Sequence, residues 1–364
     1  MTALKTHAFV AFFFLLSACS EQDQAVVSKV TNTDIDSESL DNAAVSDSNE
    51  VNVYSGRKAE LIEPLLEKFT EQTGIKVNLI TGKADALITR LELEAEASPA
   101  DVLVTVDAGR LHRAKAANLL QSIDSEILNQ SIPEHLRDID KQWFGISLRA
   151  RPIFYNKEKV DPAFLSNYEN LVDERWKGRI CIRSSSNIYN QSLTASMLES
   201  EGEQSTQLWA NGLVENFARP PAGGDTDQLR AAASGVCDIA IANTYYFGRL
   251  TKSDKPEDKN VADKLAIFWP NQNDRGTHVN ISGVALTASA KNQVNAIQLI
   301  EFLVSQESQK WYSITNNEYP VIEGVELDPV LAAWGEFKRD EVSLSKLGLN
   351  NEAAVKVMDK AGWK

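Results

Sequence analysis

The sequence predicts an α/β protein with two lobes, and three observations lead to this prediction. Strand and helix patterns alternate from residue 51 onward, as in a mainly parallel sheet covered by helices. A second series of such patterns follows a long strand-like segment near residue 149. The chain has 364 residues, 43% of them hydrophobic, and its length alone allows about two domains.

The first lobe is expected over residues 51–148, with a returning stretch at about 270–290. Its first strand is "VNVYS", and the helix pattern that follows has Pro64 in or near its first turn and Gly74 as its stop. The next segments alternate in the same way, with strands "IKVNLI" and "ADVLVTVD" and helices "ADALITRLELEAEA" and "AGRLHRAKAANL".

The second lobe is expected over about 149–269 and about 291–364. The segment "FGISLRARPIFYNK" is expected to pass from one lobe to the other, and "RICIRS" and "VCDIAIAN" are expected to be strands with helices between them. "KLAIFWP" and "ISGVALT" are expected to be returning strands, followed by one or two helices. Two lobes joined in this way form a cleft, and ligands lie there at the carboxyl ends of the strands.

The first 19 residues have the pattern of a signal peptide. Lys5 precedes the apolar run "AFVAFFFLL", which is too short to span a bilayer, and "LSAC" ends it. This pattern resembles a bacterial lipobox, which implies cleavage before Cys19 and lipid attachment to its thiol. An ordinary secretory signal with an incidental cysteine is the alternative. Residues 20–50 are rich in Ser, Asp, Asn and Glu and are expected to be a disordered tether.

The charge and the motifs exclude several functions. A formal charge of −14 argues against nucleic-acid binding, because a phosphate backbone would be repelled. The sequence has no HExxH motif, no zinc-type cysteine spacing and no Walker loop. The serine run at 184–186 lacks a nucleophile elbow, so an esterase is a weak alternative and no enzymatic activity is expected.

The chain has three cysteines, and the lipobox accounts for Cys19. Cys181 and Cys237 both lie in strand-like apolar runs. If the two strands are neighbours, a disulfide between them would stabilise the fold in an oxidising compartment. Two buried free thiols are the alternative.

Tyrosines recur where predicted strands end: Tyr54, Tyr189, Tyr245 and Tyr246. Two adjacent side chains point to opposite faces of a strand and diverge by about 100° on a regular helix. Only a turn or a helix start would therefore let Tyr245 and Tyr246 reach one point. The plain alternative is that one ring packs in a core while the other lies on the surface.

The chain resembles the periplasmic ferric-iron-binding proteins of ABC transporters, a branch of the type II "Venus flytrap" solute-binding proteins. The resemblance covers about residues 51–340 and rests on several segments, chiefly "VNVYSGRKAELIEPLLEKFTEQTGIKV", "SPADVLVTVDAGRL", "WKGRICIRSSSNIYNQSL", "ARPPAGGDTDQLRAAASGVCDIAIANTYYFGRL" and "RGTHVNISGVAL". It implies two lobes of mixed sheets with covering helices. It also implies a monomer in the periplasm or cell envelope that contacts the membrane only through its lipid and delivers iron to a permease.

The same resemblance implies a metal site. Tyr189, Tyr245 and Tyr246 match the family's iron ligands, and Tyr54 matches the fourth tyrosine of some members, so we expect Tyr54 to arrive by hinge closure. Some members place a histidine after the first tyrosine, where this chain has "SGRKAE". Outside the expected signal peptide the histidines are His112, His135 and His278, and only His278 lies in a family-like motif.

The chemistry of these residues agrees with iron. Ferric iron prefers anionic oxygen donors, which phenolates supply, although ionising a tyrosine of pKa near 10 at pH 7 costs about 4 kcal/mol. Arg57, Arg110 and Arg149 lie near strand ends, where they could balance excess phenolate charge or a synergistic anion such as carbonate; surface arginines are the alternative. A cluster of neutral tyrosines could instead bind an organic cation, such as a polyamine or a thiamine-like solute, or stack on a sugar.

Overall fold

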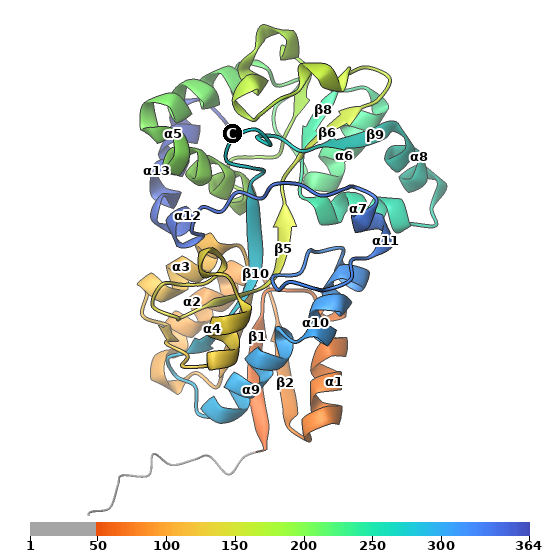
Figure 1. The fold of residues 1–364 in the computed structure, drawn as a ribbon. Coiled ribbons are helices and arrows are strands. Elements are labelled where there is room, and N and C mark those ends of the chain that lie inside the picture. The colour runs from red at the N-terminus through yellow and green to blue at the C-terminus, as the bar shows by residue number, and fades with distance from the viewer. Residues whose placement is uncertain (1–48) are drawn as a thin grey trace, which may run out of the picture. The chain divides into compact units, whose positions relative to one another are not determined.

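The computed structural model describes residues 49–364, which form two β-sheets with covering helices (Figure 1). The signal peptide, Cys19 and nearly all of the expected tether lie outside the described residues. The first strand already begins at Glu50, one residue earlier than expected. Among residues 49–364, no helix combines the length and the apolar character needed to cross a membrane.

The first sheet has the strand order β2-β1-β3-β10-β4, and β5 pairs with β10. Strand β1 runs parallel to β2 and β3, whereas β10 runs antiparallel to its three neighbours. The alternating strand and helix patterns of the sequence thus produce the expected parallel pairs. The strands are β1 Glu50–Ser55, β2 Lys76–Thr81, β3 Val102–Val106, β4 Leu120–Gln121, β5 Phe144–Ala150 and β10 Val279–Thr287.

The second sheet has the strand order β7-β8-β6-β9, with β7 parallel to β8 and β6 antiparallel to both of its neighbours. Its strands are β6 Ile153–Asn156, β7 Ile180–Cys181, β8 Ile239–Ile241 and β9 Leu265–Phe268. The chain passes between the sheets from β5 to β6 and again from β9 to β10. Strands β5 and β10 pair with each other, and Figure 1 shows them running between the two sheets. The two-lobed α/β fold predicted from the sequence is confirmed.

Helices cover both sheets. The two signals expected at the first long helix are present, because Pro64 lies in its first turn and Gly74 ends it in the left-handed conformation. The helices are α1 Glu63–Thr73, α2 Ala84–Glu94, α3 Ala108–Ala116, α4 Glu126–Ser131, α5 Ile188–Glu215, α6 Asp225–Ser234, α7 Thr244–Lys252, α8 Pro256–Lys264, α9 Gln293–Leu303, α10 Gln306–Trp311, α11 Pro329–Ala332, α12 Ser345–Leu349 and α13 Asn351–Lys360. Short 3₁₀ helices span Ala59–Leu61, Ala95–Ala97, Glu134–Leu136, Pro162–Phe164, Glu169–Val172 and Glu174–Trp176, and a π-helix spans Tyr312–Asn316.

Helices α9 and α10 pack on the first sheet, although residues 291–364 were expected to belong to the second lobe. Leu299, Ile300 and Leu303 of α9 lie in the core of the first sheet. The chain leaves β10 at Thr287, inside that sheet, and α9 covers the nearest apolar face. Farther along the chain, Val357 and Met358 of α13 pack in the core of the second lobe.

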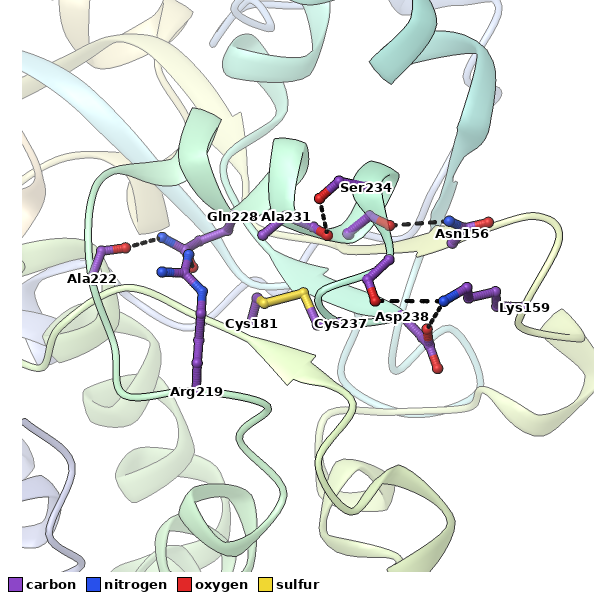
Figure 2. Close-up of a disulfide and its surroundings, with 12 residues drawn as sticks. Asn156, Lys159, Cys181, Arg219, Ala222, Gln228, Ala231, Ser234, Cys237 and Asp238 are labelled. Atoms are coloured by element: carbon purple, nitrogen blue, oxygen red, sulfur yellow. Dashed lines mark hydrogen bonds and ion pairs between the residues drawn. A yellow bond between two sulfur atoms is a disulfide. The ribbon is translucent and has the colours of Figure 1, made fainter.

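Cys181 and Cys237 form a disulfide in the second lobe, with their Cα atoms 5.9 Å apart. Figure 2 shows the bond between the short strand β7 and the segment that leads into β8. The two strands are indeed neighbours, with Cys181 opposite Ala240. Both half-cystines are buried beside Phe154, Leu229 and Ala240, in a small apolar cluster under α6.

Candidate metal centre

Three of the four selected tyrosines meet at the helix starts of the second lobe. The Tyr245 hydroxyl donates a hydrogen bond to the Tyr189 hydroxyl oxygen at 3.1 Å. The ring centroids of Tyr245 and Tyr246 lie 4.2 Å apart. A helix start was one of the two arrangements that would let the adjacent phenols reach one point, and α7 begins at Thr244, directly before them.

All three tyrosines lie in the first turn of a helix. Tyr189 is the second residue of α5, whose cap residue Asn187 accepts a hydrogen bond from the Tyr189 backbone N–H at 3.1 Å. Tyr245 and Tyr246 are the second and third residues of α7. A helix N-terminus carries a partial positive charge, so this placement favours the anionic form of a phenol.

Arginine side chains surround the cluster. The guanidinium carbons of Arg149 and Arg183 both lie 5.6 Å from the ring centroid of Tyr189, and that of Arg151 lies 6.0 Å from it. Arg249 lies 5.1 Å from the Tyr245 ring and 5.9 Å from the Tyr246 ring. These cations favour negative charge on the phenols and disfavour a bound cation that does not ionise them.

Without a metal, burial keeps the phenols of the α7 pair neutral. Burial, and after it repulsion from the neighbouring Tyr189, raises the pKa of Tyr246 to about 12. Burial is also the main cause that raises the pKa of Tyr245 well above 10, and repulsion from Tyr189 and Tyr246 is the second cause. A ligand that binds these oxygens as phenolates must therefore supply the free energy that removes their protons.

Arg151 holds the supporting residues of the cluster in place. Its guanidinium donates to Asn190 Oδ1 at 2.7 Å, to Asp225 Oδ2 at 2.8 Å and to Asn243 Oδ1 at 3.0 Å. Asn190 follows Tyr189 on α5, and Asn243 caps α7. One buried side chain therefore connects the starts of the two helices that carry the tyrosines.

Sequence reasoning selected Arg149 and missed Arg151, Arg183 and Arg249. The signals were present: Arg151 lies two residues after Arg149, and Arg183 follows the strand that leads to Tyr189. Arg249 stands three and four residues after the paired tyrosines, which is the spacing of neighbours on one helix face.

Tyr54 is not brought to the cluster. Its hydroxyl donates to the carboxylate of Glu94 at 2.9 and 3.1 Å, and the Arg90 guanidinium lies 4.7 Å from its ring. Burial and the Glu94 carboxylate raise the Tyr54 pKa. The alternation of β1 turns this side chain toward α2, and only 1% of Tyr54 is exposed.

The three arginines selected from the sequence have different surroundings. Arg57 forms a buried ion pair with Glu318 at 2.9 Å, and Arg110 forms a two-pronged pair with Asp85, with its shorter contact at 2.8 Å. Arg149 donates to Ser282 Oγ at 3.2 Å, while its Nε and Nη2 atoms have no partner among the described residues. Arg149 is therefore the one of the three that faces a tyrosine of the cluster with donors to spare.

The histidines do not add a clear ligand. His278 lies beside Tyr189 and Arg149 in the lining of a narrow gap, and burial holds its pKa well below 6.5. His112 lies on α3 and His135 in the 3₁₀ helix Glu134–Leu136, both in the first lobe. Within residues 49–364, no group of three His, Cys, Asp or Glu side chains is placed to hold a metal ion.

Comparisons with known proteins show the family to which the chain belongs. Residues 65–339 match the family model described as bacterial extracellular solute-binding protein. Iron uptake protein A1 of Synechocystis sp. is 52% identical over 315 residues, which cover 86% of this chain and 88% of that protein. The major ferric iron-binding protein of Neisseria meningitidis is 28% identical over 86% of this chain and 93% of its own length.

Solved structures show the same similarity. The Trichodesmium protein IdiA (FutA), in complex with iron and citrate ligands, is 54% identical with a TM-score of 0.85, over 86% of this chain and 100% of that one. The ferric binding protein of Campylobacter jejuni is 43% identical with a TM-score of 0.82, again over 86% of this chain and 100% of that one. The names of these relatives describe uptake and binding proteins and not enzymes.

Proposed function

Because the chain belongs to the bacterial extracellular solute-binding proteins, and within them to the periplasmic ferric-iron-binding branch, we propose that it captures ferric iron through the phenolate oxygens of Tyr189, Tyr245 and Tyr246. The chain is a binding protein of a transport system, not an enzyme. The observation that carries the proposal is the 3.1 Å separation of the Tyr189 and Tyr245 hydroxyl oxygens, next to the Tyr246 ring, whose centroid lies 4.2 Å from that of Tyr245.

Charge and donor chemistry support ferric iron as the cargo. Three phenolates carry three negative charges and so match a trivalent cation, and hard oxygen donors suit such an ion. Ionising Tyr246 at pH 7, from a pKa of about 12, costs about 7 kcal/mol. A trivalent ion can supply this free energy through its attraction to the phenolates, whereas a singly charged organic cation would supply far less.

The proposed set contains three tyrosines rather than four. Tyr54 is left out because its hydroxyl is already bonded to Glu94 on the other side of β1. Three protein oxygens leave positions on the iron for other donors. We propose that a small anion, such as carbonate or a carboxylate, fills them, in line with the iron and citrate in the Trichodesmium relative. The free donors of Arg149 suit such an anion.

The surroundings of the phenols argue against an organic cation as the cargo. Four guanidinium groups, those of Arg149, Arg151, Arg183 and Arg249, lie within 6.0 Å of the tyrosine rings. A polyamine or a thiamine-like cation entering this site would be repelled unless the phenols had first ionised.

The wider role follows from the family and from the start of the chain. We propose that the protein is exported, is anchored through a lipid on Cys19, acts as a monomer and delivers iron to an ABC transporter permease. Residues 1–48, which would carry the signal and the anchor, lie outside the described residues. Mass spectrometry of the mature N-terminus tests the anchor, with a diacylglycerol-modified Cys19 as the expected result and an unmodified Cys19 as the contradicting one.

Metal analysis and absorption spectroscopy of the purified protein test the iron site. Ferric citrate should produce a visible phenolate-to-iron charge-transfer band and a metal content of one iron per chain. Tyr189→Phe, Tyr245→Phe and Tyr246→Phe should each weaken binding and shift the band. An unchanged spectrum and affinity in all three variants would reject the proposed ligand set.

A further inference from the structure

The tyrosines of the candidate metal centre are carried by two very short strands. Tyr189 follows β7, and Tyr245 and Tyr246 follow β8, which have two and three residues. The register between them consists of two pairs, Ile180 with Ile239 and Cys181 with Ala240. Strand β7 is also the edge strand of the second sheet, and an isolated bridge between Ile180 and Phe217 lies on its outer side. Few backbone contacts therefore hold the segment leading to Tyr189 against the segment leading to Tyr245.

The disulfide lies at the base of both segments. Cys181 ends β7 and Cys237 precedes β8 by two residues, so the bond joins β7 to the segment that leads into β8 (Figure 2). Tyr189 and Tyr245 each stand eight residues beyond a half-cystine, and 56 residues separate the members of both pairs. Two chain segments of equal length, 181–189 and 237–245, therefore start at the disulfide. They come together again at the hydroxyl oxygens of Tyr189 and Tyr245.

We propose that the Cys181–Cys237 disulfide is a positioning element of the iron site, which keeps Tyr189 in register with Tyr245 and Tyr246. This proposal rests on the proposed function. A parallel pair with two register positions allows β7 to slide or tilt against β8, and the tyrosines at the ends of the segments would follow that movement. The disulfide prevents it, and the bond is itself held among buried apolar side chains.

A second connection near the tyrosines limits the size of the effect. Arg151 joins Asn190 of α5 to Asn243 before α7, and Asn190 Nδ2 donates to the Arg183 carbonyl at 2.7 Å. These polar contacts keep the segments near each other when the disulfide is absent, but they are shorter-lived than a covalent bond. Loss of the disulfide should therefore loosen the site without abolishing it.

The test compares iron release from wild-type protein, Cys181→Ala/Cys237→Ala and Leu265→Ala. Leu265 is buried in β9, at the opposite edge of the same sheet but in the same apolar cluster as the disulfide, and serves as the control for loosening of that cluster with the disulfide intact. Each protein is loaded with ferric citrate, and release of iron to an excess of a strong chelator is followed through the charge-transfer band. The temperature is one at which far-UV circular dichroism shows all three proteins to be folded.

The expected result is about tenfold faster release from the double alanine variant, a typical effect of removing support from a metal site, with a shifted absorption maximum. Leu265→Ala should keep the wild-type rate and maximum. The same rate and maximum in the double variant would overturn the proposal, and so would equally fast release from Leu265→Ala. Absence of any iron band in wild-type protein would instead reject the proposed function, so the two failures are distinguishable.

If the double alanine protein does not fold, a second variant tests the same proposal. Cys181→Val/Cys237→Ala fills more of the volume left by the sulfur atoms, and sucrose favours the folded state. The expected rate and spectrum are those of the double alanine variant. Wild-type behaviour in this folded protein would overturn the proposal.

Discussion

The hydroxyl groups of Tyr189 and Tyr245 lie 3.1 Å apart, although 56 residues separate them in the chain. This hydrogen bond needs at least one proton, because two phenolates at that distance repel each other. The pair is therefore neutral or singly ionised in the free protein. A multivalent cation between the oxygens would reverse the repulsion, so the site changes its protonation when it is filled.

Substituting the clustered tyrosines should weaken iron binding strongly. Tyr245→Phe removes an oxygen and leaves a ring of the same shape, so the fold should be retained. Loss of supporting groups around a metal costs about 10- to 100-fold in affinity, and loss of a direct ligand should reach or exceed about 100-fold. Competition with a chelator of known affinity measures the change, and a loss of less than threefold would contradict the assignment.

Tyr54→Phe is the matched control for these variants. It removes the hydrogen bonds to Glu94, but that carboxylate keeps Arg90 at 2.6 Å and Ser98 at 2.8 Å. We expect a stability loss of about 1 kcal/mol by urea denaturation and no change in iron affinity or absorption maximum. A loss of iron affinity comparable to that of Tyr245→Phe would show that Tyr54 is a ligand after all.

Iron binding should weaken steeply on acidification. Each phenol that gives up a proton on binding makes the apparent affinity fall about tenfold per pH unit, so three phenols give about a thousandfold. A pH-stat measurement during iron addition should record three protons per iron, after correction for the iron source. Release of fewer than two protons would exclude three phenolate ligands.

The free protein should lose stability in alkali. The pKa of Tyr246 is raised to about 12 in the folded state, against about 10 for an exposed tyrosine, so the folded chain holds this proton more tightly than the unfolded chain. This contribution is present below about pH 10 and is lost as the pH rises toward about 12. Urea denaturation of iron-free protein at pH 8 and pH 11 should therefore show a smaller loss of stability in Tyr246→Phe than in wild type. An equal loss would indicate that other groups govern the alkaline transition.

Arg151→Met should destabilise the protein more than removal of an exposed charge. It removes the 2.8 Å ion pair of the fully buried Asp225, which keeps only the longer contact with Arg183 at 3.4 Å and the Asn243 backbone N–H at 2.7 Å. Loss of one partner of a buried ion pair costs about 3–5 kcal/mol. Lys356→Met on α13, which removes an exposed pair with Glu352, is the control and should change stability little. Chemical denaturation measures both, and equal effects would contradict the supporting role of Arg151.

Several features could be predicted because they depend on neighbouring residues in the chain. Pro64 and Gly74 bound the first long helix through backbone rules that act within one turn. The paired tyrosines required a turn or a helix start, and α7 supplies the helix start. The assignment of α9 and α10 to a lobe could not be predicted in this way, since an amphipathic helix does not specify which of two apolar faces it covers.

Local pattern by itself determined the alternation of strands and helices, the two-lobed α/β fold and the position of the tyrosines where strands end, because these follow from periodicity and from short-range backbone preferences. Only the tertiary structure decided that Tyr54 turns to Glu94 while Tyr189 meets Tyr245, and that Arg151 connects their supports. The physical reason is that such contacts depend on the register and facing of strands far apart in the chain, where one step along a strand sends a side chain to the opposite side of a sheet.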